Sequence, residues 1–195
     1  MAELMLPVDE TTIRELTVGT YLELTGRMIT GRDAAHTWLL EKFQEDVAPI
    51  LKDTVIYHCG PVVNRKSDGS YEFVAAGPTT SIREEPYQAD VIARYGLRGV
   101  IGKGGMGPKT LDGLGRSGAV YLHAIGGAAQ VLASAVKRVE SVYMLEEFGV
   151  PEALWVIHVE KFPVVVTMDS HGGSLHFDVE KDSQQRLEQM LGLAS

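Results

Sequence analysis

Hydrophobic and polar positions along this chain form short alternating runs, separated by segments rich in glycine and proline. Period-two alternation and short β-branched runs predict strands. The predicted strands are residues 20–29, 54–57, 71–76, 97–101, 119–125, 155–159 and 164–168. Helical spacing predicts helices over residues 33–50, 128–139 and 182–191, and a further helix that starts at Ser81. Strands and helices alternate loosely, which predicts one mixed α/β domain over residues 1–195.

Polar and glycine-rich segments recur where the predicted strands end. These segments are residues 31–33, 58–61, 77–83, 102–107, 126–127 and 169–173. In α/β sheets, ligands usually bind at strand-end loops. The loops carry three cations and two further polar side chains: Arg32, Arg83, Lys103, His58 and Thr79. We therefore expect one shared site.

Residues 77–83 combine two ways of holding a carboxylate. Ser81, with Glu84 three residues later, has the pattern of a capping box at a helix start. A helix start offers free N–H groups and the positive end of the peptide dipole. Arg83 adds a forked cation suited to carboxylates. The segment predicts a site for a small acid, although the same residues also suit an ordinary helix cap with a solvated arginine.

The glycine loop at residues 102–107 formally spells the dinucleotide pattern G-x-G-x-x-G after a strand. The next strand ends at Gly126 without the carboxylate that would bind a ribose. No Lys-Ser/Thr pair closes the loop, so it is not a Walker A loop. We interpret it as a loop that lets the backbone and Lys103 approach a compact anion.

Other catalytic templates fit poorly. The chain has no G-x-S-x-G nucleophile elbow. The six histidines lack metal-ligand spacing. Asp169, His171 and His176 could be assembled into a metal site, but the glycines at 172 and 173 favour a turn. Cys59 follows His58, but adjacent strand residues point to opposite faces, so a nucleophile–base pair is disfavoured. We expect a buried cysteine.

Composition limits the function classes further. The chain has 195 residues, of which 45% are hydrophobic, enough to bury a substantial core. A net charge of −8 without a basic patch argues against nucleic-acid binding. No apolar run approaches the roughly 20 residues that span a bilayer, and residues 1–10 lack a signal-peptide pattern. The single cysteine favours a reducing compartment, so we expect a cytoplasmic protein.

Five motifs resemble, in order and spacing, those of one known family. They are residues 31–36, 58–63, 77–83, 101–108 and 151–156. The chain is similar to the β subunit of class I fumarate hydratase and of L(+)-tartrate dehydratase, a unit that is the C-terminal domain in single-chain relatives. The resemblance covers residues 6–178. It implies the swivelling β/β/α fold, a single α/β domain with a mixed sheet.

The resemblance implies a hydro-lyase that reversibly hydrates fumarate to (S)-malate or dehydrates tartrate. Family members use an oxygen-sensitive 4Fe-4S cluster held by three cysteines of the other subunit or domain. The single Cys59 agrees with a chain that holds no cluster and is inactive alone. The implied partners are a cluster-bearing α subunit and a dicarboxylate substrate. Exposed edges and apolar faces also predict a homodimer when the chain is isolated.

By matching motif positions, the resemblance implies substrate contacts for five residues: Arg32, Thr79, Thr80, Arg83 and Lys103. It also implies a proton-transfer role for Thr79. Fumarate is a dianion, and desolvating it requires paired positive charge. A free threonine hydroxyl is a poor base, so Thr79 would need help from a neighbouring cation or from substrate.

Fewer residues bear on the choice of substrate. Residues 124–129 resemble the fumarase branch more than the tartrate branch. Mesaconate stays open, because a hydrophobic pocket rejects one methyl group by only ~1–3 kcal/mol. Glu84 and Glu85 depart from the family pattern near an anion pocket, and we expect both to point outward. Cys59 also departs from the family pattern, because alanine is common at this position.

A non-catalytic dicarboxylate-binding module is the rival from another class. An exposed apolar face around the strand-end loops would favour the hydro-lyase subunit, because a partner must cover it. A closed polar rim would favour the binding module.

Overall fold

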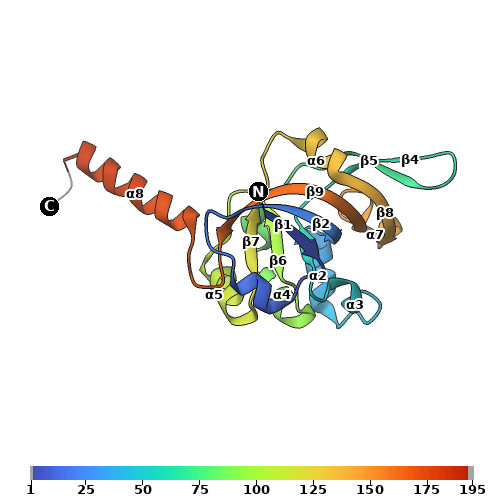
Figure 1. The fold of residues 1–195 in the computed structure, drawn as a ribbon, viewed down its shortest axis with the longest axis horizontal. Coiled ribbons are helices and arrows are strands. Elements are labelled where there is room, and N and C mark those ends of the chain that lie inside the picture. Colours follow the sequence, from blue (N-terminus) through green and yellow to red (C-terminus); the bar gives the residue numbers. More distant parts are fainter. Residues whose placement is uncertain (1, 193–195) are drawn as a thin grey trace.

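The computed structural model describes residues 2–192. It is built on a seven-stranded mixed sheet with the strand order β1-β2-β3-β6-β7-β9-β8 (Figure 1). The strands of this sheet are β1 (Ala2–Leu6), β2 (Tyr21–Thr30), β3 (Val55–Tyr57), β6 (Gly99–Gly102), β7 (Val120–His123), β8 (Val136–Tyr143) and β9 (Leu154–Met168). A separate hairpin pairs β4 (Val62–Arg65) with β5 (Tyr71–Ala75).

The helices surround these strands. They are α1 (Glu10–Arg14), α2 (Asp33–Glu41), α3 (Ala48–Leu51), the 3₁₀ helix η1 (Ser81–Glu84), α4 (Gln88–Tyr95), α5 (Pro108–Ser117), α6 (Ala129–Ala135), α7 (Leu145–Phe148) and α8 (Leu175–Met190). α8 projects away from the rest of the molecule (Figure 1). Within residues 2–192, no helix is both long and apolar enough to cross a membrane.

The sheet closes into a small barrel because β9 pairs on two sides. β2, β3, β6 and β7 are successive parallel neighbours, and β9 runs antiparallel to both β2 and β7. Val165 of β9 pairs with Tyr21 of β2 and with His123 of β7. Five strands therefore form a closed ring, with β1 and β8 outside it.

The core divides according to strand alternation, since successive side chains point to opposite faces. Val55 and Tyr57 of β3 belong to the cluster inside the ring, whereas Ile56 between them packs under the outer helices. Trp155 lies in the inner cluster with no exposed surface. Its ring meets Tyr71 and Phe73 of the hairpin edge to face, at centroid distances of 5.0 and 5.9 Å. These contacts fix the hairpin against the barrel.

The mixed α/β class is confirmed, and the swivelling β/β/α assignment stays a prediction. The predicted strands at residues 20–29, 54–57, 71–76, 97–101 and 119–125 are found with small shifts of their ends. The strands predicted at residues 155–159 and 164–168 are parts of the single strand β9.

The prediction of one helix over residues 33–50 is wrong. α2 ends at Glu41 and α3 begins only at Ala48, because the chain between them is held by Tyr95 of α4. The Tyr95 hydroxyl accepts a hydrogen bond from the Gln44 N–H at 3.0 Å, and its ring stacks on Phe43 at 5.3 Å. A tertiary contact thus replaces the next helical turn.

The prediction of a helix over residues 128–139 is half wrong. α6 ends at Ala135, and the following residues form β8, which pairs with β9 from Val136 to Tyr143. The available edge of β9 and the β-branched residues of this segment favour the strand. The predicted terminal helix exists, but it begins at Leu175 rather than at residue 182.

Candidate active site

The loops that follow the parallel strands meet at one end of the barrel. The Thr79 N–H donates to the carbonyl of His58, which follows β3, at 2.7 Å. The Lys103 N–H, after β6, donates to the Thr79 carbonyl at 3.2 Å, and the Ser81 N–H donates to the Lys103 carbonyl at 3.0 Å. Thr80 and Lys103 form a parallel bridge. The structure therefore brings Thr79, Thr80 and Lys103 together.

Lys103 supplies an uncommitted positive charge to this cluster. Its side chain takes part in no ion pair within residues 2–192. Its stem lies beside the loop after β7, since a Cβ placed on Gly126 would be 3.8 Å from Lys103 Cδ. A third strand-end loop thus borders the cluster.

Arg32 approaches the same end of the barrel from β2. Its Nη1 lies 3.1 Å from Oε1 of Glu152, and its side chain is only 20% exposed. A Cβ placed on Gly60 would lie 2.7 Å from this Nη1, so the glycine leaves room for the guanidinium next to the loop after β3. Arg32 is held in place by a carboxylate.

Arg83 is also paired, with Asp33. Its side chain is 55% exposed, so it lies at the rim of the cluster. Asp33 follows Arg32 directly, so the start of α2 carries one arginine and binds the other. All five residues predicted from the motifs therefore lie around the same strand ends, although their roles stay predictions.

The predicted capping box at Ser81 is wrong. Residues Ser81–Glu84 form the 3₁₀ helix η1, and α4 begins only at Gln88. The Ser81 hydroxyl does not cap η1, because it is buried and hydrogen-bonded to His58 and Tyr121. The free helix start expected to hold an anion is therefore absent from this segment. Of the two predicted anion-binding features, only the guanidinium of Arg83 is present.

A fully buried polar network lies beneath the loops. Ser81 Oγ lies 2.9 Å from His58 Nδ1 and accepts a hydrogen bond from the Tyr121 hydroxyl at 2.8 Å. Oε1 of Gln88 in α4 lies 2.7 Å from Nε2 of His58 and 2.9 Å from Nε2 of His36, and Nε2 of Gln88 has no hydrogen-bond partner among the described residues. These five side chains have no exposed surface. They join β3, β7, α2, α4 and η1 directly under the site.

The network is electrically neutral. Burial lowers the pKa of His58 to about 3 and also lowers the pKa of His36. Nδ1 of His36 donates to the Arg32 carbonyl at 2.9 Å, so its Nε2 must accept a hydrogen bond. Exchanging the amide oxygen and nitrogen of Gln88 meets this requirement, because the amino group then donates to both Nε2 atoms instead of remaining without a partner. The buried layer then holds its hydrogen bonds without a net charge.

Gly102 is required by this network. A Cβ at this position would lie 1.9 Å from Ser81 Oγ and 3.1 Å from the Tyr121 hydroxyl oxygen. Any other residue would displace the serine. The first glycine of the loop at residues 102–107 therefore serves packing under the site, a role that its sequence pattern did not reveal.

The Fumarase C-terminus family matches residues 2–179. The chain belongs to this family. The match confirms the resemblance seen in the five motifs, and it covers the strand-end loops and the network beneath them.

Three relatives illustrate the similarity. Over 186 residues the chain is 53% identical to "Putative fumarate hydratase class I" of Geobacillus stearothermophilus, covering 95% of this chain and 35% of that protein. Over 184 residues it is 40% identical to "Putative L(+)-tartrate dehydratase subunit beta" of Methanocaldococcus jannaschii, covering 93% and 94%. Over 173 residues it is 37% identical to L(+)-tartrate dehydratase subunit beta of Escherichia coli K12, covering 88% and 85%. The chain thus spans about a third of the Geobacillus protein and most of the two β subunits.

The side chains of Glu84 and Glu85 do not point outward, although the sequence predicted that they would. Glu84 is 1% exposed, and its Oε2 has no hydrogen-bond partner among the described residues. Burial, with the Asp33 carboxylate nearby, raises the pKa of Glu84 to about 8, so this side chain is a neutral acid at pH 7. Glu85 accepts hydrogen bonds from the N–H groups of Gly107 at 2.8 Å and Thr110 at 3.1 Å. It thereby caps the start of α5, and the prediction that both glutamates point outward is wrong.

Two residues considered as catalytic or metal-binding candidates are structural. Cys59 is buried as predicted, and burial raises the pKa of its thiol to about 12. Asp169 accepts hydrogen bonds from the N–H groups of Val18, His171 and Gly173 at 2.9–3.0 Å, which confirms the predicted turn.

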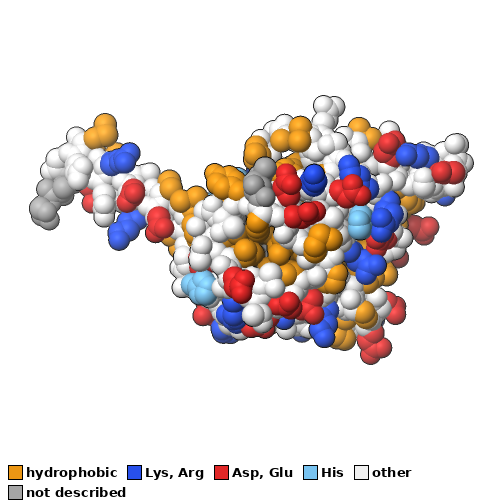
Figure 2. Space-filling model, in the orientation of Figure 1, with side chains coloured by type: hydrophobic (Ala, Val, Ile, Leu, Met, Phe, Trp, Pro, Cys, Tyr) orange, Lys and Arg blue, Asp and Glu red, His pale blue; other side chains and the backbone are white. Residues whose placement is uncertain are grey.

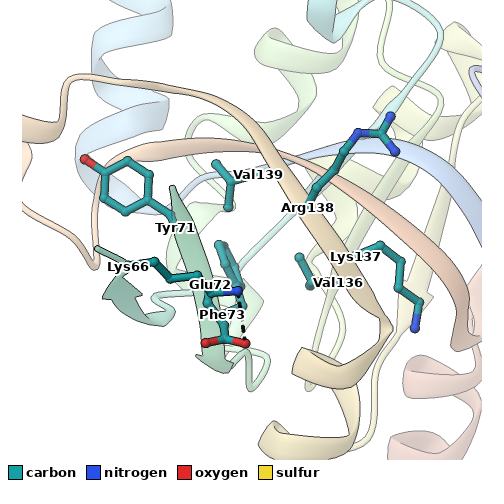
Figure 3. Close-up of a pocket in the computed structure, with 8 residues that line it drawn as sticks. All are labelled: Lys66, Tyr71, Glu72, Phe73, Val136, Lys137, Arg138 and Val139. Atoms are coloured by element: carbon teal, nitrogen blue, oxygen red, sulfur yellow. Dashed lines mark ion pairs between the residues drawn. The ribbon is translucent and has the colours of Figure 1, made fainter. Parts of the chain in front are cut away.

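A hollow elsewhere on the molecule is unsuited to a diacid. It lies between the β4–β5 hairpin and β8, and its volume is about 60 Å³ (Figure 3). Two of its three cations are in ion pairs, since Lys66 pairs with Glu72 at 3.5 Å and Arg138 pairs with Glu140 at 2.8 Å. The third, Lys137, donates to the Ser134 carbonyl at 2.9 Å. The strand-end loops remain the better candidate site.

Proposed function

We propose that this chain supplies the substrate-binding cations and hydroxyls of a hydro-lyase that reversibly hydrates fumarate to (S)-malate. The observation that carries the proposal is the meeting of Lys103 with Thr79 and Thr80, with two arginines at the same strand ends. The 53% identity to a relative named for fumarate hydratase supports fumarate as the substrate. L(+)-tartrate is the second candidate, since two relatives named for tartrate dehydratase match nearly the same residues.

The proposal gives a dicarboxylate three cations with which to pair. Taking a dianion out of water requires cations that replace its hydration. Arg32 and Arg83 now hold Glu152 and Asp33, so a substrate carboxylate competes with a protein carboxylate for each arginine. Lys103 adds a charge that no protein carboxylate neutralises. We infer that one substrate carboxylate binds near Lys103 and the threonines, and that the arginines orient the other.

These cations can also lower the barrier. Addition of water to fumarate places negative charge on the carboxylate conjugated to the attacked double bond. Fixed cations near that carboxylate stabilise the transition state more than the ground state, which is the requirement for catalysis. Lys103 is the residue that we assign to this role.

Thr79 is better suited to binding than to removing a proton. Its Oγ1 donates to the His58 carbonyl at 3.0 Å, which leaves its lone pairs to accept a hydrogen bond. No carboxylate or imidazole hydrogen-bonds to Thr79 among the described residues. Any proton transfer through this hydroxyl would therefore need a base from the partner, and we propose Thr79 as a substrate-orienting group.

The 4Fe-4S cluster of the proposal does not fit on this chain. Cys59 is its single cysteine and is buried. Within residues 2–192, no group of three or more His, Cys, Asp or Glu side chains could hold a metal ion. We therefore place the cluster, which would supply a Lewis acid, on an α subunit, as the names of the two β-subunit relatives support.

Exposed apolar residues flank the site, as a covering partner requires. Ile82 of η1, Ile125 after β7 and Val131 of α6 are 50%, 64% and 63% exposed. A free-standing binding module would need a closed polar rim instead. This surface favours the hydro-lyase subunit over the non-catalytic module.

The test uses the assembled enzyme, isolated anaerobically with its partner from native cells and assayed by loss of fumarate absorbance. Lys103→Met should lower turnover by at least about a hundredfold, in line with loss of a transition-state contact. Lys109→Met is the matched control, because Lys109 pairs with Asp90 on the surface at 2.8 Å. Wild-type kinetics in Lys103→Met would refute the site.

The same preparation distinguishes the alternatives. Parallel assays with L(+)-tartrate and mesaconate decide the substrate. An isolated chain that binds fumarate stoichiometrically, and that recovers neither iron nor a partner, would replace the hydro-lyase with the binding module.

A further inference from the structure

Glu84 is one of two buried acidic residues within residues 2–192, and the other is Asp169. Three N–H groups donate to Asp169, which is the usual arrangement of a buried carboxylate. Oε2 of Glu84, by contrast, has no hydrogen-bond partner among the described residues. The remaining acidic side chains reach solvent, and Figure 2 shows many of them beside lysines and arginines. Glu84 is therefore buried without the donors that an ionised carboxylate requires.

A proton on Glu84 meets this requirement, and Asp33 is the group that can accept a hydrogen bond from it. η1 packs against α2, and the carboxyl of Glu84 hydrogen-bonds to the carboxyl of Asp33. Two carboxyl groups at this distance share one proton, because both cannot be ionised together. Asp33 carries the charge, since it is 37% exposed and paired with Arg83, whereas Glu84 is 1% exposed. The neutral acid thus donates to the carboxylate that holds Arg83.

The charges around this acid pair balance. The charged groups that act on Glu84 are Asp33 of α2, Glu152 before β9 and Arg83 of its own element. Arg32 in turn holds Glu152. Two carboxylates and two arginines therefore cancel while Glu84 keeps its proton. Loss of the proton would leave one net negative charge beside Arg83.

We propose that Glu84 is a positioning residue whose proton controls how firmly Asp33 holds Arg83 against a substrate carboxylate. It rests on the proposed function, in which Arg83 orients one carboxylate of the diacid. With the proton present, Glu84 donates to Asp33 and stabilises its charge after Arg83 has moved to the substrate. Without the proton, two carboxylates hold Arg83, and the added charge repels a dianion. By linkage, the diacid should bind the protonated form of the protein more tightly.

The KM of the assembled enzyme between pH 6.5 and pH 9.5 tests this coupling. Because the pKa of Glu84 is raised to about 8, the KM of the wild type should rise across this range, by about fivefold for an ion pair as exposed as Arg83 and Asp33. Glu84→Gln keeps a donor for Asp33 and cannot ionise, so its KM should stay at the value that the wild type has at pH 6.5. His36, a buried residue near the same carboxylates, is uncharged throughout this range because burial lowers its pKa.

A second variant separates the donated hydrogen bond from the charge. Glu84→Met removes the donor without adding a charge, so Asp33 has no partner other than Arg83. Its KM should be higher than that of Glu84→Gln at every pH and should not change with pH, with kcat little altered. Glu85→Gln is the matched control, because the adjacent carboxylate caps α5 instead. This variant should keep the rise of KM that the wild type shows.

Infrared spectroscopy of the full chain detects the proton without catalysis. The C=O band of a protonated carboxyl should disappear near pH 8 in the wild type and should be missing from Glu84→Gln at pH 6.5. A wild-type band already lost at pH 6, or parallel KM profiles for the wild type and Glu84→Gln, would overturn the proposal. Failure of the site itself would appear separately, as wild-type kinetics in Lys103→Met. The KM profile is measured with whichever diacid the enzyme converts, so a different substrate leaves this test intact.

Discussion

Glu84 provides a sharp test of the electrostatics under the site. Its carboxyl is 1% exposed and its pKa is raised from 4.5 to about 8. In the unfolded chain the group loses its proton near pH 4.5, whereas in the folded chain it keeps the proton up to about pH 8. Folding therefore takes up a proton between these values, and the free energy of unfolding falls as pH rises through this window. Below pH 4.5 this cost disappears, and above pH 8 it is constant.

The size of the effect follows from the shift. One pKa unit corresponds to about 1.4 kcal/mol, so the full shift sets an upper limit of about 5 kcal/mol. Local hydration and relaxation reduce this, and we expect a cost of about 1–3 kcal/mol at pH 8 relative to pH 5. Glu84→Gln removes the titration with almost no change of shape. The variant should match the wild type at pH 5 and exceed its stability by about 1–3 kcal/mol at pH 8.

Urea unfolding of both proteins at pH 5, 6, 7 and 8 makes the measurement. The buried histidines add their own pH dependence, but they are common to both proteins and cancel in the difference. Glu85→Gln is the matched control and should have the opposite sign, because it weakens hydrogen bonds to Gly107 and Thr110. Parallel pH profiles for Glu84→Gln and wild type would show that Glu84 is ionised in the folded chain, and the reasoning would be wrong.

Three further changes probe the site and the network. Gly102→Ala should destabilise the fold by about 1–3 kcal/mol in thermal unfolding, because its Cβ would overlap Ser81 Oγ; an unchanged Tm would contradict the close packing. Asp33→Asn should lower the KM for fumarate of the assembled enzyme up to about fivefold, the worth of an exposed ion pair; a higher KM would mean that Asp33 orients Arg83. Since the pKa of His58 is lowered from 6.5 to about 3, the contribution of His58 to stability should fall as pH drops below 6.5. His58→Gln should therefore lose less stability than the wild type between pH 6.5 and pH 4 in urea unfolding followed by the fluorescence of Trp38 and Trp155; equal slopes would exclude this contribution.

The sequence predicted strands well where the local pattern and the final pairing agree. Residues 54–57 contain Thr, Val and Ile, and residues 97–101 end in Val100 and Ile101 before a glycine; both segments become central strands of the barrel. It failed where a distant element competed with local preference. Residues 136–139 continue a helical pattern, yet the edge of β9 draws them into β8. Local periodicity contains no information about an edge that is formed about 20 residues later.

The same distinction applies to the site. The motifs placed Arg32, Thr79 and Lys103 in strand-end loops, and the carboxyl ends of parallel strands necessarily lie together. The buried layer was missed because Gln88 and Tyr121 reach it from separate elements, with no local signature. Glu84 was misread, since its spacing from Ser81 fits a capping box as well as it fits a buried acid.

On the proposed function, the neutral layer and the paired arginines determine how the site binds a diacid. The groups beneath Lys103 carry no charge, so its field toward the loops is not cancelled from below. On the proposed function, a dicarboxylate can reach Lys103 and also displace Asp33 or Glu152 from an arginine. A monocarboxylate can satisfy only one of these cations, and the other arginines keep their protein partners. The gain from the second carboxylate is then reduced by the cost of displacing Asp33 or Glu152, and this is why Asp33→Asn should lower the KM for fumarate.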